Sequence, residues 1–203
     1  MKKFIAILLA AFVVLGCFTA CSGGGTNDDT ETTLAEDGKL RVPDDPEKTY
    51  ESNSYKEFSA IDLAGKKYDQ SIWEGKKLTM VNIWATFCRP CINEMPDLEI
   101  LSKEYAEKDF QIIGMISDVD YDGEFCYDTA LINKALDVIE MTGVTYVNLL
   151  PSFSLIDIKL ENVYSVPETI FVDENGNQVG ESYIGSRSLE DWKAIVDNLL
   201  ATM

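Results

Sequence analysis

The stretch KLTMVNIWATFCRPCINEMPDLEILSKEYAEKDFQIIGMIS, residues 77–117, decides the fold that this sequence predicts. It begins with an apolar run over 77–85, which is typical of a strand buried on both faces. Apolar residues then recur at helical spacing over 91–107, and Pro96 is expected to kink that helix without ending it. A second buried strand is expected over 110–117. This order predicts a βαβ unit with a parallel pair of strands.

The remaining segments extend this unit in both directions. Residues 58–68 read as a hairpin that turns at Asp62, Ala64 and Gly65. Residues 129–144 favour a helix and 145–150 a short strand, whereas 151–165 are ambiguous. An Asn-Gly turn at 175 and 176 predicts an antiparallel hairpin over 168–185. The chain then closes with an amphipathic helix over 188–203, for which Ser188 is the expected N-cap.

Composition divides the chain into a signal and anchor over 1–21, an acidic flexible linker over 22–52, and a globular domain over 53–203. The apolar run at 4–15 follows Lys2 and Lys3 and is too short to span a bilayer comfortably. A small residue precedes both Cys17 and Cys21, which resembles a bacterial lipoprotein signal. Cys21 is the preferred lipidation site because a Gly/Ser tether follows it, and Cys17 is the alternative. An ordinary signal peptide with incidental cysteines stays open.

Charge and missing residue types exclude several classes of function. Asp and Glu number 35 against 17 Lys and Arg, so the formal net charge is −18. Such a chain repels phosphate backbones and anionic headgroups, and we expect no nucleic-acid binding. Any membrane attachment is expected to come from lipid. The chain contains no histidine, which removes Ser-His-Asp and Cys-His catalysis and His-ligated zinc.

Cys88 and Cys91 form a CxxC pair directly after the first predicted strand of the βαβ unit. A structural zinc site needs four ligands, and beyond the signal region only Cys126 remains, so we expect no metal here. A disulfide across so short a loop adds little constraint on the unfolded chain. Redox exchange is therefore the favoured interpretation, as is usual for CxxC near a βαβ pattern.

The predicted position of the pair suits thiol chemistry. Cys88 falls at or before the first helical turn, where unpaired backbone N–H groups and the helix dipole favour a thiolate. Pro90 suits a position near the start of a helix. Cys91, one turn further in, is expected to be the shielded partner that resolves a mixed disulfide. Arg89 either adds favourable charge or points into solvent.

The motif VNIWATFCRPCINEMPDL, together with YSVPETIFVDENGNQVG, resembles extracytoplasmic thiol-disulfide oxidoreductases of the TlpA/ResA type. The resemblance covers about residues 55–203. It implies a thioredoxin fold, in which helices flank a central mixed β-sheet, with an N-terminal β-hairpin extension and an αβ element inserted within 120–150. It also implies that Pro167 is a cis-proline facing the dithiol, and that Val166 offers backbone hydrogen bonds to a substrate chain.

The same resemblance suggests further site residues. Glu94 matches a glutamate that exchanges protons with the cysteine pair, and the alternative is a first-turn acid that complements the helix dipole. Trp84 and Arg89 are candidates for substrate contact, with a core position as the alternative for Trp84. Phe87 replaces the tryptophan that usually precedes the first cysteine. Cys126 lies outside the motif, and we expect a buried, inert thiol.

These observations predict an enzyme on the extracytoplasmic face of the cell membrane that exchanges its Cys88–Cys91 dithiol with protein disulfides, as a reductant. No cofactor besides this dithiol is expected. In the TlpA/ResA-type family, such proteins are re-reduced by a membrane thiol electron carrier of the CcdA type. They serve cytochrome c maturation or the repair of oxidised surface proteins.

Three other functions compete with this prediction. A disulfide-forming oxidant stays open, although the CRPC sequence lacks the Pro-His pair of strongly oxidising relatives. A peroxidase of the peroxiredoxin class would need Thr or Ser at 85 and Pro at 81, where this chain has Ala85 and Val81. A non-catalytic binding module with the same fold also stays open.

Overall fold

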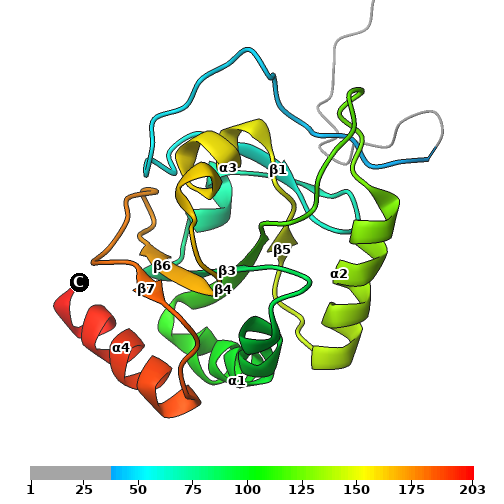
Figure 1. The fold of residues 1–203 in the computed structure, drawn as a ribbon. Coiled ribbons are helices and arrows are strands. Elements are labelled where there is room, and N and C mark those ends of the chain that lie inside the picture. The colour runs from blue at the N-terminus through cyan, green and yellow to red at the C-terminus, as the bar shows by residue number, and fades with distance from the viewer. Residues whose placement is uncertain (1–37) are drawn as a thin grey trace, which may run out of the picture.

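A computed structural model describes residues 38–203 of the chain, and its centre is a five-stranded mixed sheet (Figure 1). The strand order is β5-β4-β3-β6-β7. The strands are β3 (Leu78–Trp84), β4 (Phe110–Ile116), β5 (Asn148–Leu149), β6 (Glu168–Val172) and β7 (Tyr183–Ile184). This arrangement confirms the predicted fold class of helices around a mixed sheet.

The βαβ unit predicted from residues 77–117 is confirmed. Strand β3, buried at all seven positions, leads into α1 (Arg89–Tyr105), and β4 returns parallel to β3. Pro96 lies inside α1, and the helix continues past it as its apolar spacing predicts. A short 3₁₀ turn, η2 (Ala106–Lys108), joins α1 to β4.

The second half of the sheet is antiparallel, and its hairpin is less regular than expected. Strand β6 pairs with β3, and Gly176 takes the predicted turn at φ +75°. A Cβ on Gly176 would lie 2.7 Å from the carbonyl oxygen of Tyr55, so only glycine fits there. The returning arm pairs first through an isolated bridge at Gln178 and again as β7, with Gly180 at φ +71° between them.

Helices cover both faces of the sheet (Figure 1). Helix α1 and the closing helix α4 (Leu189–Thr202) lie together on one face, where apolar side chains such as Met80, Leu98 and Trp192 form a core. On the opposite face lie α3 (Phe153–Ile158) and the N-terminal hairpin, over a second apolar cluster. Ser188 caps α4 as predicted, by accepting from the N–H of Asp191 at 3.2 Å.

The two additions to the basic fold are both present. The N-terminal hairpin pairs β1 (Ser59–Ile61) with β2 (Lys67–Asp69), and the 3₁₀ turn η1 (Gln70–Trp73) follows. The inserted element consists of α2 (Thr129–Thr142) and β5, which runs parallel to β4. The ambiguous stretch after β5 forms α3 and the 3₁₀ turn η3 (Leu160–Asn162).

Residues 40–44 are anchored on the domain, so the prediction that a flexible linker extends through them is wrong for this part. Val42 is only 6% exposed and joins the apolar core. The Asp44 carboxylate accepts hydrogen bonds from the backbone N–H groups of Phe153 and Ser154 at the start of α3. Single anchoring residues in a polar segment do not change its average composition, which is why composition predicted a linker.

The signal peptide, the lipidation candidates Cys17 and Cys21, and residues 22–37 of the predicted linker lie outside the described residues. Over 38–203, no helix combines the length and the apolar character that crossing a bilayer requires.

Candidate active site

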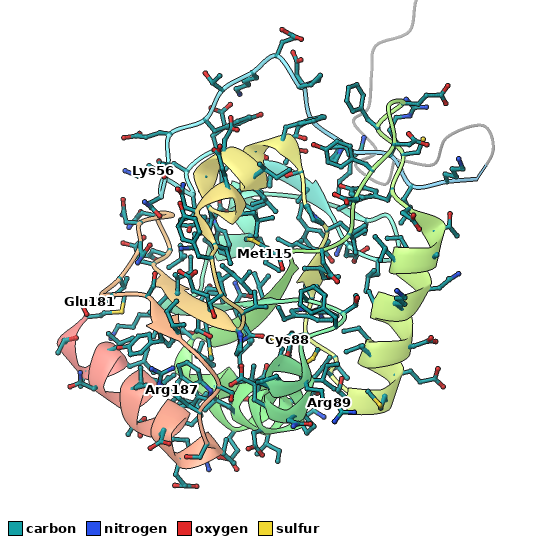
Figure 2. The ribbon with its side chains drawn as sticks, viewed as in Figure 1. Lys56, Cys88, Arg89, Met115, Glu181 and Arg187 are labelled. Atoms are coloured by element: carbon teal, nitrogen blue, oxygen red, sulfur yellow. A yellow bond between two sulfur atoms is a disulfide. The ribbon has the colours of Figure 1, made fainter. Side chains whose placement is uncertain are left out.

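Cys88 and Cys91 are joined by a disulfide at the junction of β3 and α1 (Figure 2). Cys88 is the N-cap of α1, and its Sγ accepts from the N–H of Cys91 at 3.2 Å. The residue at position 88 is 5% exposed, whereas Cys91 is fully buried. An incoming sulfur therefore reaches Cys88 first, and the first turn of α1 presents backbone donors to a thiolate there.

A side-chain clamp holds the loop in front of Cys88. The Asp118 carboxylate accepts from the Thr86 N–H at 3.0 Å and from the Thr86 hydroxyl at 2.7 Å. Asp118 follows β4, so this clamp ties together the carboxyl ends of two parallel strands. It fixes the direction in which the chain enters the dithiol turn.

The peptide bond between Val166 and Pro167 is cis, as the sequence resemblance predicted. It directly precedes β6, which runs antiparallel to β3 with Glu168 opposite Ile83. The start of β6 therefore lies beside the end of β3 that leads to Cys88. Val166 is half-buried and packs against two apolar clusters, one of which contains both cysteines. The strand register and this packing therefore place Val166 near the end of β3 that leads to the dithiol.

Glu94 is a buried carboxylate, 3% exposed, on the same face of α1 as Cys91. It lies beyond the first turn of the helix, so the dipole-complementing alternative does not describe it. Its Oε2 accepts from the Arg187 N–H at 3.1 Å and from Trp192 Nε1 at 3.3 Å, and its Oε1 accepts from Asn82 Nδ2 at 3.2 Å. Burial raises the pKa of Glu94 above its ordinary value, and these three donors oppose the rise.

The environment of Glu94 contains two buried polar atoms without a hydrogen-bond partner. These atoms are Asn82 Oδ1 and the Tyr146 hydroxyl. Burial raises the pKa of Tyr146, and the nearby carboxylates of Glu94 and Glu99 raise it further, so this phenol stays protonated. Asn82 also donates to Thr169 Oγ1 at 3.2 Å, which links the carboxylate to β6. A buried acid beside polar atoms that lack hydrogen-bond partners can gain or lose a proton without breaking an existing hydrogen bond of those atoms.

The residue after the cis-proline belongs to a buried ion pair. Glu168 and Lys159 contact each other through Oε1 and Nζ, and their side chains are only 5% and 7% exposed. Lys159 ends α3, so the pair ties that helix to the start of β6. The buried hydroxyl of Tyr55 has no hydrogen-bond partner, and burial together with the Glu168 carboxylate raises its pKa.

The exposed rim of the site differs from the predicted set of substrate contacts. Trp84 is fully buried, with its Nε1 donating to Asn148 Oδ1 at 2.9 Å, so the prediction that it contacts substrate is wrong in this structure. Arg89 is exposed at the first position of α1. Phe87 is 75% exposed and Tyr164 is 90% exposed, and both flank segments that form the site.

Cys126 is a buried free thiol, as expected from the sequence. It lies in the loop before α2, where it forms an isolated bridge with Arg41 of the N-terminal segment. Its position is thus explained by the packing of residues 38–44 against that loop.

Several residues that build the site were missed by sequence reasoning. They are Asn82, Asp118, Tyr146, Lys159, Glu168, Arg187 and Trp192. Asn82 gave a signal that could have been used, because a polar side chain in the middle of a fully buried strand needs a partner. Trp192 gave none, since it fits the apolar stripe of α4.

Comparisons with known proteins agree with this geometry. The protein-family model Redoxin matches residues 50–199. The chain is 29% identical over 205 residues to the thiol:disulfide interchange protein DsbE of Vibrio cholerae, an alignment covering 100% of this chain and 96% of that protein. It is 34% identical over 110 residues to the thiol-disulfide oxidoreductase ResA of Bacillus thuringiensis, covering 49% of this chain and 60% of ResA.

Solved structures show the same fold. A thiol:disulfide interchange protein of the thioredoxin family from Chlorobium tepidum superposes with a TM-score of 0.58 at 23% identity, over 75% of this chain and 99% of that chain. Together with the disulfide at the start of α1, these matches identify the class of enzyme. The chain belongs to the Redoxin family, as a thiol-disulfide oxidoreductase of the TlpA/ResA type with a thioredoxin fold.

Proposed function

We propose that this enzyme is tethered to the outer face of the cell membrane and reduces disulfides in other proteins. The observation that carries the proposal is the asymmetry of the dithiol: Cys88 caps α1 and is slightly exposed, and Cys91 is fully buried behind it. One sulfur is thus placed to meet a substrate and the other to release it.

The reaction begins when the Cys88 thiolate attacks one sulfur of a substrate disulfide. A bond forms between Cys88 and that sulfur, and the other substrate sulfur leaves as a thiolate that takes up a proton. Cys91 then loses its proton and attacks Cys88 Sγ, which expels the second substrate thiolate. The substrate gains two electrons and two protons, and the enzyme is left with the Cys88–Cys91 disulfide.

Glu94 and the start of β6 have supporting roles in this scheme. The Glu94 carboxylate accepts the proton of Cys91, which lies three residues earlier on the same helical face. The backbone of Val166, before the cis peptide bond, hydrogen-bonds the substrate chain while Cys88 is bonded to it. Exposed Phe87 and Arg89 complete the contact surface beside Cys88.

The cellular setting is proposed from the N-terminal sequence. A basic start, an apolar run at 4–15 and a cysteine after a small residue support a signal peptide with lipidation at Cys21, or alternatively at Cys17. An enzyme held there needs its disulfide re-reduced, and a membrane thiol carrier of the CcdA type would supply the electrons. The reduced enzyme would then act in cytochrome c maturation or in the repair of oxidised surface proteins.

A trapping experiment tests the assignment of the two cysteines. The reduced Cys91→Ser variant should accumulate a mixed disulfide with a substrate such as insulin, because the resolving thiol is missing. The matched Cys88→Ser variant should accumulate none and should not reduce insulin. Equal trapping by both variants would refute the assigned order, and full activity without both cysteines would favour a non-catalytic binding module.

A further inference from the structure

The segment from β7 into α4 closes over the buried carboxylate of Glu94. Two donors of this segment, the Arg187 N–H and Trp192 Nε1, converge on a single oxygen, Oε2. They come from positions 93 and 98 residues away along the chain. A carboxylate in α1 is therefore held by the C-terminal helix as much as by its own βαβ unit.

Arg187 is itself locked in place by aromatic and carbonyl contacts. Its guanidinium carbon lies 5.0 Å from the centre of the Tyr183 ring and 5.1 Å from that of Trp192. Its Nη1 donates to the carbonyl oxygen of Gly185 at 2.9 Å. Figure 2 shows Arg187 in the segment that leads into α4, beside α1. A planar guanidinium can make these stacking and hydrogen-bond contacts together, whereas an ammonium cannot.

The other polar groups around Glu94 come from three further parts of the fold. Asn82 of β3 donates to Oε1, and the Tyr146 phenol, in the loop before β5, interacts electrostatically with the Glu94 carboxylate. The Cys88–Cys91 pair lies on α1 itself. Among the groups that the structure shows acting on Glu94, Arg187 is the one cation, and its charge favours the ionised carboxylate.

We propose that Arg187 and Trp192 are positioning residues that hold the Glu94 carboxylate ionised and in a fixed orientation, on the helical face that also carries Cys91. The inference rests on the proposed role of Glu94 as the acceptor of the Cys91 proton. In that step Cys91–SH and Glu94–COO⁻ become Cys91–S⁻ and Glu94–COOH, and the thiolate then attacks Cys88 Sγ. By setting how readily Glu94 takes up this proton, the C-terminal segment sets the pH range in which the mixed disulfide is resolved.

The direct test is a titration of Glu94 in the oxidised full chain, followed by NMR of ¹³C-labelled glutamate carboxyls. The Glu94 signal is assigned by its loss in Glu94→Gln. Trp192→Phe keeps the aromatic ring but removes the Nε1 donor, and we expect a roughly tenfold rise in proton affinity. Arg187→Met removes the charge and the stacking and should shift the affinity in the same direction.

Two further variants separate positioning from general effects on the fold. Arg187→Lys keeps the charge and should lie between wild type and Arg187→Met. Lys193→Met removes a cation from α4, the helix that carries Trp192. Lys193 pairs with Glu104 and Glu190 instead of Glu94, so this variant should leave the Glu94 titration unchanged. Arg187 is half-buried in a loop, so we expect its variants to fold. The Glu94 titration can therefore still be measured in them if Trp192→Phe fails to fold. Wild-type titration of Glu94 in both Arg187→Met and Trp192→Phe would overturn the proposal.

A second measurement connects the titration to function. The rate at which the preformed mixed disulfide is resolved is recorded against pH, and Arg187→Met should shift this profile in parallel with the Glu94 titration. If Glu94→Gln resolves at the wild-type rate at every pH, the proton-acceptor role of Glu94 is refuted and the inference with it. If Glu94→Gln is slow but Arg187→Met matches wild type, only the positioning role is refuted.

Discussion

Lys159 and Glu168 form a buried ion pair that joins the end of α3 to the residue after the cis-proline. Neither side chain is more than 7% exposed, so both charges depend on each other for compensation. Glu168 also pairs with β3 on one side and β7 on the other. The pair therefore fixes the start of β6, on which the cis peptide bond and the backbone at Val166 depend.

Removing one partner of this pair should destabilise the fold strongly. Lys159→Met leaves the Glu168 carboxylate buried and uncompensated, and we expect a loss of about 3–5 kcal/mol in the free energy of unfolding. The double variant Lys159→Met, Glu168→Gln should recover part of that loss. Urea unfolding of the oxidised enzyme measures both. Lys108→Met, which breaks an exposed ion pair with Asp197, is the control and should have a much smaller effect. A single-variant loss below about 1 kcal/mol would contradict this account.

The Asp118 clamp should affect the rate of thiol exchange. Asp118→Ala removes the acceptor for the Thr86 N–H and hydroxyl, so the loop before Cys88 loses its fixed direction. We expect a several-fold slower reaction of Cys88 with a disulfide, together with a loss of about 1–3 kcal/mol in stability. Asp122→Ala is a matched control, because Asp122 also accepts backbone N–H bonds, but in the loop around Cys126. An equal slowing in both variants would show a general effect on folding.

Burial of Glu94 should make stability depend on pH. Its pKa is raised in the folded state above the ordinary value of 4.5, so the unfolded chain ionises at lower pH than the folded one. The contribution of protonated Glu94 to the free energy of unfolding is therefore fully present below the pKa of the unfolded chain. It is lost as the pH rises through the higher pKa of the folded state. Relative to wild type, Glu94→Gln should gain stability as pH increases from about 4 to 8. Parallel wild-type and variant curves from urea unfolding over that range would contradict the raised pKa.

Phe87 and Trp84 should differ in what their replacement disturbs. Phe87 is 75% exposed beside Cys88, so Phe87→Ala should raise the KM for a peptide disulfide with little change in stability. Trp84 is fully buried and donates to Asn148, so Trp84→Phe should lower stability and leave KM nearly unchanged. Peptide-disulfide kinetics and urea unfolding of both variants decide the matter. A raised KM for Trp84→Phe and an unchanged KM for Phe87→Ala would show that Trp84, and not Phe87, contacts the substrate.

The elements that sequence reasoning predicted are those with a strong local pattern. A few neighbouring residues encode each of them: the seven consecutive buried positions of β3, the periodic apolar stripe of α1, and the cap of α4 at Ser188. The CxxC pair is equally local, since its place at the end of a strand and the start of a helix follows from its immediate flanks. Local signals therefore yielded the βαβ unit, the closing helix and the two redox residues, whereas the thioredoxin fold as a whole was implied by the family resemblance.

The features that were missed depend on residues far apart in the chain. Trp192 fits the apolar stripe of α4, and nothing near it indicates that its Nε1 bonds Glu94, 98 positions away. Val42 and Asp44 anchor a segment whose composition is that of a linker. Lys159 lies in a stretch without clear periodicity, and its partner Glu168 reads as one residue of a hairpin. Such pairings arise only when the folded chain brings these segments together.

The reduction potential of the Cys88–Cys91 pair tests the central claim most directly. The mature chain would be equilibrated in thiol buffers of known potential, and its free thiols would then be trapped and counted. The account of a protein-disulfide reductant predicts a potential near or below about −250 mV, in the range of thioredoxin. A value near about −120 mV would contradict it and make the enzyme a disulfide-forming oxidant.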